Sequence, residues 1–170
     1  NKGLELKKVY VSMIADLLHA GHINILEEAS KHGEVTVGLL TSTAINELSD
    51  TSYLKYQQRH DVIKNLKMVA NIIPQKEASY KNNLKKLKPD YVVHGDDWKN
   101  GKQSKYRSEV IDILNKWGGE LIEVPYSSEI NDQNLKNQLM KLGVTTVHRL
   151  GRLRKLIKDK PIVRILEAHN

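Results

Sequence analysis

The chain has 170 residues, a formal net charge of +7, a sequence pI of about 9.4, and neither cysteine nor phenylalanine. This length suffices for one domain with a hydrophobic core. The absence of cysteine excludes disulfides, zinc–thiolate sites and thiol catalysis, and it fits a cytoplasmic location.

The excess of positive charge favours anionic ligands. Lysine and arginine are nevertheless spread over helical faces, which is typical of solvated surface, and aromatic side chains that could stack on bases are few, so we expect no nucleic-acid partner. No run approaches the roughly 20 apolar residues of a membrane helix, and no secretory leader pattern is present. We therefore expect no membrane partner.

Short apolar runs alternate with amphipathic stretches along the chain. Strands are predicted at 8–14, 35–41, 70–74, 90–95 and 120–124, and helices at 22–32, 56–69, 79–87 and 104–117. Nearly continuous apolar strands between amphipathic helices are typical of a parallel sheet covered on both faces. The predicted fold is a Rossmann-like, doubly wound α/β fold with a five-stranded parallel sheet and a C-terminal helical extension.

Three polar, glycine-marked or turn-rich segments follow strand ends: 15–22, 95–102 and 125–132. Because ligands of doubly wound sheets bind beyond the carboxyl ends of the strands, these segments should converge on one site.

The first of these segments contains two histidines around a glycine, His19-Ala20-Gly21-His22. It joins an apolar strand to an amphipathic helix, and a helix N-terminus favours anions through its unpaired N–H groups and its dipole. Two imidazoles at that position add donors for phosphate oxygens, while Gly21 allows a ligand close to the backbone. The alternative is that His19 and His22 only cap the helix or lie half-buried.

Four blocks, in order, resemble the cytidylyltransferase superfamily of HxGH nucleotidyltransferases, which includes glycerol-3-phosphate and phosphocholine cytidylyltransferases. The blocks are Asp16-Leu17-Leu18-His19-Ala20-Gly21-His22, Tyr56-Gln57-Gln58-Arg59, Lys88-Pro89-Asp90-Tyr91-Val92-Val93 and His94-Gly95-Asp96-Asp97-Trp98. The last block is the most specific, since Gly-Asp-Asp-Trp after a strand is much rarer than HxGH.

Two further segments resemble a subgroup, the cytidylyltransferase domains that precede phosphoenolpyruvate mutase in bifunctional enzymes of phosphonate biosynthesis. They are Val9 to Asp16 and the tail Leu150 to Asn170. The resemblance implies a cytidylyltransferase domain over 1–143, and over 144–170 a linker helix with the truncated start of a mutase domain. Mutase activity is therefore not expected of this chain.

The resemblance implies attack by a phosphate or phosphonate oxygen on the α-phosphorus of CTP, with Mg²⁺ as the cofactor and Asp96 as its candidate ligand. His19, His22 and Asp16 would be catalytic; Asp16 would orient the histidines or support Mg²⁺, or serve as a helix-start carboxylate. The implied nucleotide-binding residues are Met13, Ile14, Gly21, Lys55, Arg59, His94, Gly95, Asp96, Asp97, Trp98, Tyr126, Ser127, Ser128 and Ile130. For Arg59 a surface ion pair, and for Trp98 a place in the core, are the alternatives.

The chain departs from the family pattern at 126–132, where the family has an Arg-Thr-Glu-Gly-Ile-Ser-Thr segment that holds phosphates. Here Glu129 and Asp132 place negative charge beside the expected triphosphate, which costs binding energy unless the carboxylates turn away or bind metal. The family's lysines before Tyr-x-x-Arg are also missing, with Lys55 the nearest candidate.

Four functions follow in order of preference. The first is a cytidylyltransferase acting on a small phosphonate or phosphate ester, such as 2-hydroxyethylphosphonate or 2-aminoethylphosphonate. The second is a degenerate nucleotide-binding or dimerisation domain that regulates an attached phosphoenolpyruvate mutase. A nucleotidyltransferase using ATP or another acceptor comes third, and nucleic-acid binding last. The resemblance also implies a homodimer.

Overall fold

The computed structural model describes residues 6–100, 103–125 and 137–138. Strands and helices alternate along it as β1 (Lys8–Met13), α1 (Ala20–His32), β2 (Glu34–Leu40), α2 (Ser42–Glu47), α3 (Tyr56–Ile63), β3 (Asn71–Gln75), α4 (Lys81–Leu87), β4 (Tyr91–Gly95), the 3₁₀ turn η1 (Asp96–Lys99), α5 (Ser104–Leu114) and β5 (Glu120–Val124).

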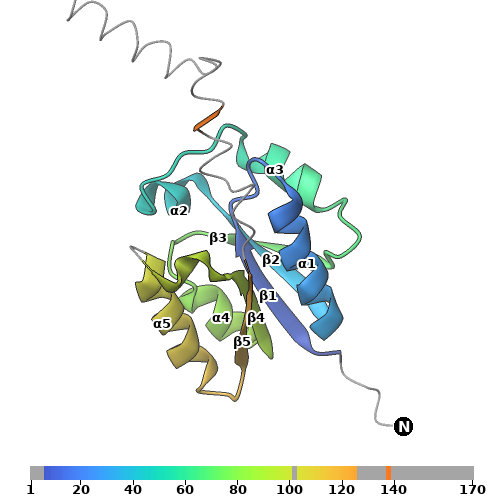
Figure 1. Cartoon of the computed structure of the whole chain (residues 1–170), viewed down its shortest axis with the longest axis vertical. Helices are drawn as coiled ribbons and strands as arrows, with labels where there is room; N and C mark the ends of the chain where they lie inside the picture. The colour runs from blue at the N-terminus through green and yellow to red at the C-terminus, as the bar shows by residue number, and fades with distance from the viewer. Residues whose placement is uncertain (1–5, 101–102, 126–136, 139–170) are drawn as a thin grey trace, which may run out of the picture. The chain divides into compact units, whose positions relative to one another are not determined.

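The five strands form one parallel sheet in the order β3-β2-β1-β4-β5 (Figure 1). The chain builds outward from β1 to β3 on one side, then crosses back and places β4 beside β1. This confirms the predicted doubly wound sheet. The reversal of strand order lies between β1 and β4, and the carboxyl ends of these two strands are the edge where ligands bind in such sheets.

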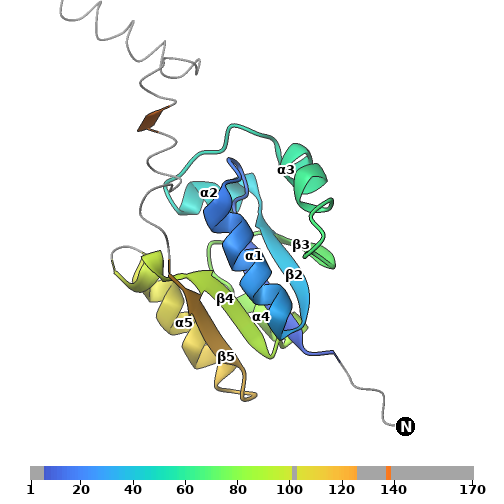
Figure 2. The ribbon, with the colours of Figure 1, turned by 45° about the vertical axis from the view of Figure 1, so that its right-hand side comes forward.

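Alternate residues of β1 supply two separate hydrophobic cores, as the two-residue period of a strand requires. Val9 and Val11 pack with Leu26 of α1, whereas Tyr10 packs on the opposite face with Leu84 of α4. Helices α1 and α3 thus cover one face of the sheet and α4 and α5 the other (Figures 1 and 2).

The helix predicted at 56–69 is wrong at its C-terminal end, because α3 stops at Ile63. The chain continues as tight turns in which Leu66 N–H bonds to Ile63 O and Val69 N–H to Leu66 O, three residues back rather than four. Leu66, Met68 and Val69 still pack against the core from these turns. Their helix-like apolar spacing therefore persists without a helix.

Smaller differences between the predicted and observed structure concern the other helices. The helix predicted at 104–117 ends at Leu114, where turns lead to Gly118 with a φ of 78°. The predicted start of α1 at residue 22 is two residues late. The helix α2 was not predicted, although Thr41 is a good N-cap residue and its hydroxyl accepts from Ala44 N–H at 3.4 Å.

The chain divides into two compact units, residues 1–129 and 130–170. In the second unit the structure describes residues 137 and 138, which are helical and exposed. The expected boundary at 143 and the linker over 144–170 lie outside the described residues. Among the helices that are described, none is both long and apolar enough to cross a membrane.

Candidate active site

The turn from β1 into α1 is built by its two histidines. His19 caps α1, because its Nδ1 accepts the Gly21 backbone N–H at 3.0 Å. His22 returns the interaction, since its Nδ1 accepts the His19 backbone N–H at 3.4 Å. The ring centroids lie 4.2 Å apart, and the side chain of His22 is buried. The two rings therefore form one unit fixed to the backbone.

This capping arrangement determines the tautomer of both rings. A neutral imidazole whose Nδ1 accepts a hydrogen bond carries its proton on Nε2. Each ring thus has a donor at Nε2, at the end of a helix whose dipole favours negative charge. Both histidines therefore cap the helix through Nδ1, as the alternative interpretation of the pair had it, and capping through Nδ1 is compatible with anion binding at the same helix end.

Asp16 lies in the same turn but does not contact the histidines by hydrogen bond. Its two carboxylate oxygens accept the backbone N–H groups of Tyr53 and Leu54 at 2.7 and 2.8 Å, and its side chain is buried. The role expected of Asp16 in orienting His19 and His22 has no direct hydrogen bond behind it and stays a prediction. In this structure the Asp16 carboxylate fixes the segment that leads into α3, where Arg59 is located.

Arg59 is fully buried, so the surface ion pair considered for it is excluded. Its Nη1 donates to the carbonyls of Ile14 and Leu40 at 2.6 and 2.9 Å, joining the chain just beyond β1 to the end of β2. Burial lowers the pKa of the guanidinium, an effect partly offset by Asp16. Among the described residues, Nη2 is buried without a hydrogen-bond partner.

A buried donor without a partner costs about 1–3 kcal/mol, and more when charged. A bound anion within reach of Nη2 would remove this cost. The phosphate contact that the family resemblance implies for Arg59 stays a prediction, because the side chain is fully buried in this structure.

The turn after β4 forms the opposite side of the candidate site. β1 and β4 are neighbouring parallel strands, with Val9 opposite Tyr91 and Tyr10 opposite Val92, so their carboxyl ends lie at the same edge of the sheet. Asp96 and Asp97 then form the first turn of η1. The structure thus brings the HxGH and Gly-Asp-Asp-Trp blocks to neighbouring strand ends, as expected.

Trp98, which could have been a ligand contact or a core residue, belongs to the core. It is 1% exposed and packs with Tyr80, while its ring stacks on His94 with centroids 3.8 Å apart and planes 11° apart. His94 Nδ1 lies 2.8 Å from the Gly95 carbonyl, so Nδ1 carries the proton and Nε2 is an acceptor when the ring is neutral. Burial lowers the pKa of His94, which favours that neutral ring.

Two residues that the sequence reading missed hold Trp98 in place. Glu123 of β5 accepts the Trp98 indole N–H at 2.9 Å and binds Arg107 of α5 through two hydrogen bonds of 2.8 and 3.0 Å. The Arg107 hydrogen bond, assisted by that from Trp98, lowers the pKa of Glu123 to about 2. The signal in the sequence was a single carboxylate within the apolar run Leu121-Ile122-Glu123-Val124.

The remaining expected residues are placed as follows. Gly21 is buried in the first turn of α1, and Lys55 is the exposed N-cap residue of α3. Tyr126, Ser127, Ser128 and Ile130 lie outside the described residues. Within the part of the chain that the structure describes, no three His, Asp or Glu side chains form a group that could hold a metal ion.

Comparison with known proteins agrees with this geometry. The family model described as cytidylyltransferase-like matches residues 14–132. A glycerol-3-phosphate cytidylyltransferase from Bacillus spizizenii is 30% identical over 139 residues, covering 81% of this chain and all of that protein. An FAD synthase from Methanopyrus kandleri is 34% identical over 95 residues, which cover 54% of this chain and 63% of the synthase.

Two other similarities concern a longer protein and a solved structure. The bifunctional protein HldE from Magnetococcus marinus is 27% identical over 121 residues, which span 68% of this chain but 23% of HldE. The crystal structure of a lipopolysaccharide core biosynthesis protein from Thermoplasma volcanium superposes with a TM-score of 0.60 at 26% identity, covering 72% of this chain and 98% of that one.

Proposed function

Because this chain belongs to the cytidylyltransferase-like family, we propose that it transfers CMP from CTP to a small phosphate- or phosphonate-bearing acceptor and releases pyrophosphate. The observation that carries the proposal is the histidine pair at the N-terminus of α1. Both rings use Nδ1 for the backbone, so both have an Nε2 donor for phosphate oxygens.

In the proposed reaction an acceptor oxygen forms a bond to the α-phosphorus of CTP, and the bond from that phosphorus to the pyrophosphate oxygen breaks. Such transfer depends on alignment and on neutralisation of charge rather than on a covalent enzyme intermediate. His19 and His22 donate to oxygens whose charge grows in the transition state. The α1 dipole adds to this, and Arg59 supplies a fixed positive charge at the edge of the same turn.

We further propose that Mg²⁺ accompanies the nucleotide. Mg²⁺ sites on nucleotides commonly take one or two carboxylates together with phosphate oxygens and water. Asp96, in the first turn of η1, is the carboxylate that fits this role. When bound, the ion would neutralise part of the triphosphate charge and hold its oxygens in register.

For the acceptor we propose a short phosphonate of the 2-hydroxyethyl- or 2-aminoethylphosphonate type. The support is the resemblance of segment 9–16 and of the tail to the phosphonate subgroup. Glycerol 3-phosphate is the second candidate, because a relative aligned over its full length is named for that substrate. The same resemblance supports a homodimer and a fusion to a phosphoenolpyruvate mutase domain. A fusion is also in keeping with the similarity to the bifunctional protein HldE, of which the matched segment spans 23%.

The proposal is tested by following pyrophosphate release from CTP and Mg²⁺ with each phosphonate and with glycerol 3-phosphate, in parallel with ATP, GTP and UTP. CTP-dependent release with at least one acceptor is expected, and the acceptor with the highest kcat/KM identifies the substrate class. Preference for ATP would contradict the cytidine assignment. If no acceptor gives release but calorimetry detects CTP binding, the degenerate nucleotide-binding domain is the better reading.

The site is located by comparing His22→Asn with His32→Asn. His32 is on the same helix at its opposite end, where it pairs with Glu28. Loss of most activity in the His22 variant, with normal activity in the His32 variant and similar thermal unfolding of both, is expected. Equal activity of both variants would show that His22 of the HxGH turn does not take part in the reaction.

A further inference from the structure

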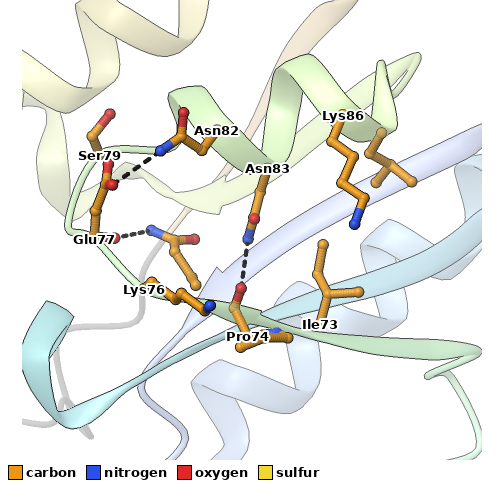
Figure 3. Close-up of a pocket in the computed structure, with 10 residues that line it drawn as sticks. Ile73, Pro74, Lys76, Glu77, Ser79, Asn82, Asn83 and Lys86 are labelled. Atoms are coloured by element: carbon orange, nitrogen blue, oxygen red, sulfur yellow. Dashed lines mark hydrogen bonds between the residues drawn. The ribbon is translucent and has the colours of Figure 1, made fainter.

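A cavity of about 440 Å³ lies between the edge strand β3 and helix α4 (Figure 3). This volume falls within the ~300–1,000 Å³ range of small-molecule pockets. None of the residues that line it is among the expected nucleotide or catalytic residues. The cavity is therefore a separate feature, whose function the reaction proposed above does not explain.

The walls of the cavity combine an apolar floor with a positive rim. Ile73, Pro74 and Leu87 supply the apolar surface. Lys86 reaches down from α4 toward Ile73, and Lys76 lies at the end of β3 beside Pro74 (Figure 3). The two ammonium groups thus come from different elements, on two sides of the same apolar floor.

The single carboxylate in the lining does not neutralise these lysines. Glu77 Oε1 accepts a hydrogen bond from Asn82 Nδ2 at 3.0 Å, also within the lining. Within residues 6–100, 103–125 and 137–138, neither Lys76 nor Lys86 forms an ion pair. The lining therefore carries two lysines and one carboxylate, an excess of one positive charge, and the carboxylate is held by Asn82.

The cavity wall is also preformed, because it is attached to the core. Asn83 Nδ2 donates to the Pro74 carbonyl at 3.1 Å and to the Tyr10 hydroxyl at 2.9 Å. Tyr10 in turn donates to the buried Gln75 at 2.7 Å. This network fixes α4 at a set distance from β3, so a ligand would not have to order the wall on binding.

We propose that this cavity binds a small organic anion, consisting of one acidic group on a short hydrocarbon body. The acidic group contacts Lys76 and Lys86, and the hydrocarbon covers Ile73, Pro74 and Leu87. The proposal does not rest on cytidylyl transfer, since it concerns binding at residues outside the nucleotide site.

The test uses three probes on the ¹⁵N-labelled protein: hexanoate, n-hexanol and inorganic phosphate. Hexanoate carries both features of the proposed ligand, hexanol only the hydrocarbon and phosphate only the charge. We expect saturable amide shifts confined to residues 73–79 and 82–87 with hexanoate at millimolar concentration, and at least about fivefold weaker binding of the other two probes.

The matched variants are Lys76→Gln/Lys86→Gln and Lys81→Gln/Lys85→Gln. Both pairs lower the net charge by two at exposed positions, but Lys81 and Lys85 do not line the cavity. Only the first pair should weaken hexanoate, by about fivefold or more, with an otherwise unchanged spectrum. The proposal is overturned by absence of saturable local shifts, by hexanol binding as tightly as hexanoate, or by equal weakening in both variants.

Discussion

The Trp98 indole N–H donates to the Glu123 carboxylate at 2.9 Å, and this bond attaches the turn after β4 to the neighbouring strand β5. The same carboxylate holds Arg107, so α5 is joined to both. The Trp98 ring stacks on His94, and Glu123 lies opposite His94 in the register of β4 and β5. Glu123 therefore supports the end of β4 both through Trp98 and as the strand neighbour of His94.

We predict that Glu123→Gln lowers the free energy of unfolding by about 1–3 kcal/mol, because a charge-assisted pair with Arg107 becomes neutral while Arg107 stays half-buried. Urea unfolding followed by tryptophan fluorescence measures this loss. Glu120→Gln, an exposed position on the same strand, is the control and should change stability by less than about 0.5 kcal/mol. An equally small effect of both substitutions would show that the Trp98–Glu123–Arg107 contacts contribute little to the free energy of unfolding.

The pH dependence of stability provides a second prediction. The pKa of Glu123 is about 2 in the folded protein, against 4.5 as its ordinary value. A depressed carboxylate pKa stabilises the fold fully above about pH 4.5, and this contribution is lost as the pH falls toward 2. Wild type should therefore lose stability more steeply than Glu123→Gln between about pH 4.5 and 3 in urea titrations. Parallel curves of stability against pH for the two proteins would contradict the low pKa assigned to Glu123.

The sheet could be predicted because buried parallel strands are nearly continuously apolar, as the segment Val35 to Leu40 illustrates, in which Thr36 is the one polar side chain. The end of α3 could not, since Leu66 and Val69 keep helical spacing while they pack from turns. The spacing of apolar residues indicates which side chains face the core. A helix and a series of turns can place the same apolar side chains on the core, so their spacing does not distinguish the two. Secondary structure after Ile63 was therefore ambiguous.

The site was predictable in composition but not in its supporting contacts. HxGH and Gly-Asp-Asp-Trp are contiguous motifs whose spacing is visible in the chain. Asp16, by contrast, binds backbone groups 37 and 38 residues away, and the Trp98–Glu123 bond spans 25 residues. The Asp16 bonds leave no mark in local spacing because any residue can supply a backbone N–H, and the Trp98 and Glu123 side chains are too far apart in the sequence to form a local pattern.

Arg59 leads to a third prediction. We expect Arg59→Lys to lower the free energy of unfolding by about 2–4 kcal/mol, because one ammonium group cannot replace the guanidinium bonds to Ile14 O, Leu40 O and Leu54 O. It should also weaken CTP binding in calorimetry at a temperature where both proteins are folded. Lys64→Gln, which removes an exposed pair with Asp61, is the control and should affect neither quantity measurably. Loss of stability with unchanged CTP affinity would restrict Arg59 to a structural role.

Gly38 leads to a fourth prediction. A Cβ built on Gly38 would lie 1.8 Å from the Tyr10 hydroxyl and 3.0 Å from Gln75 Oε1, so the buried Tyr10–Gln75 bond requires glycine here. We expect Gly38→Ala to cost about 1–3 kcal/mol of stability through overpacking. In a Tyr10→Leu background the same substitution should cost much less, because the clashing ring is gone. A double-mutant cycle in urea measures the difference, and additivity within about 0.5 kcal/mol would show that the ring is not what excludes a side chain at this position.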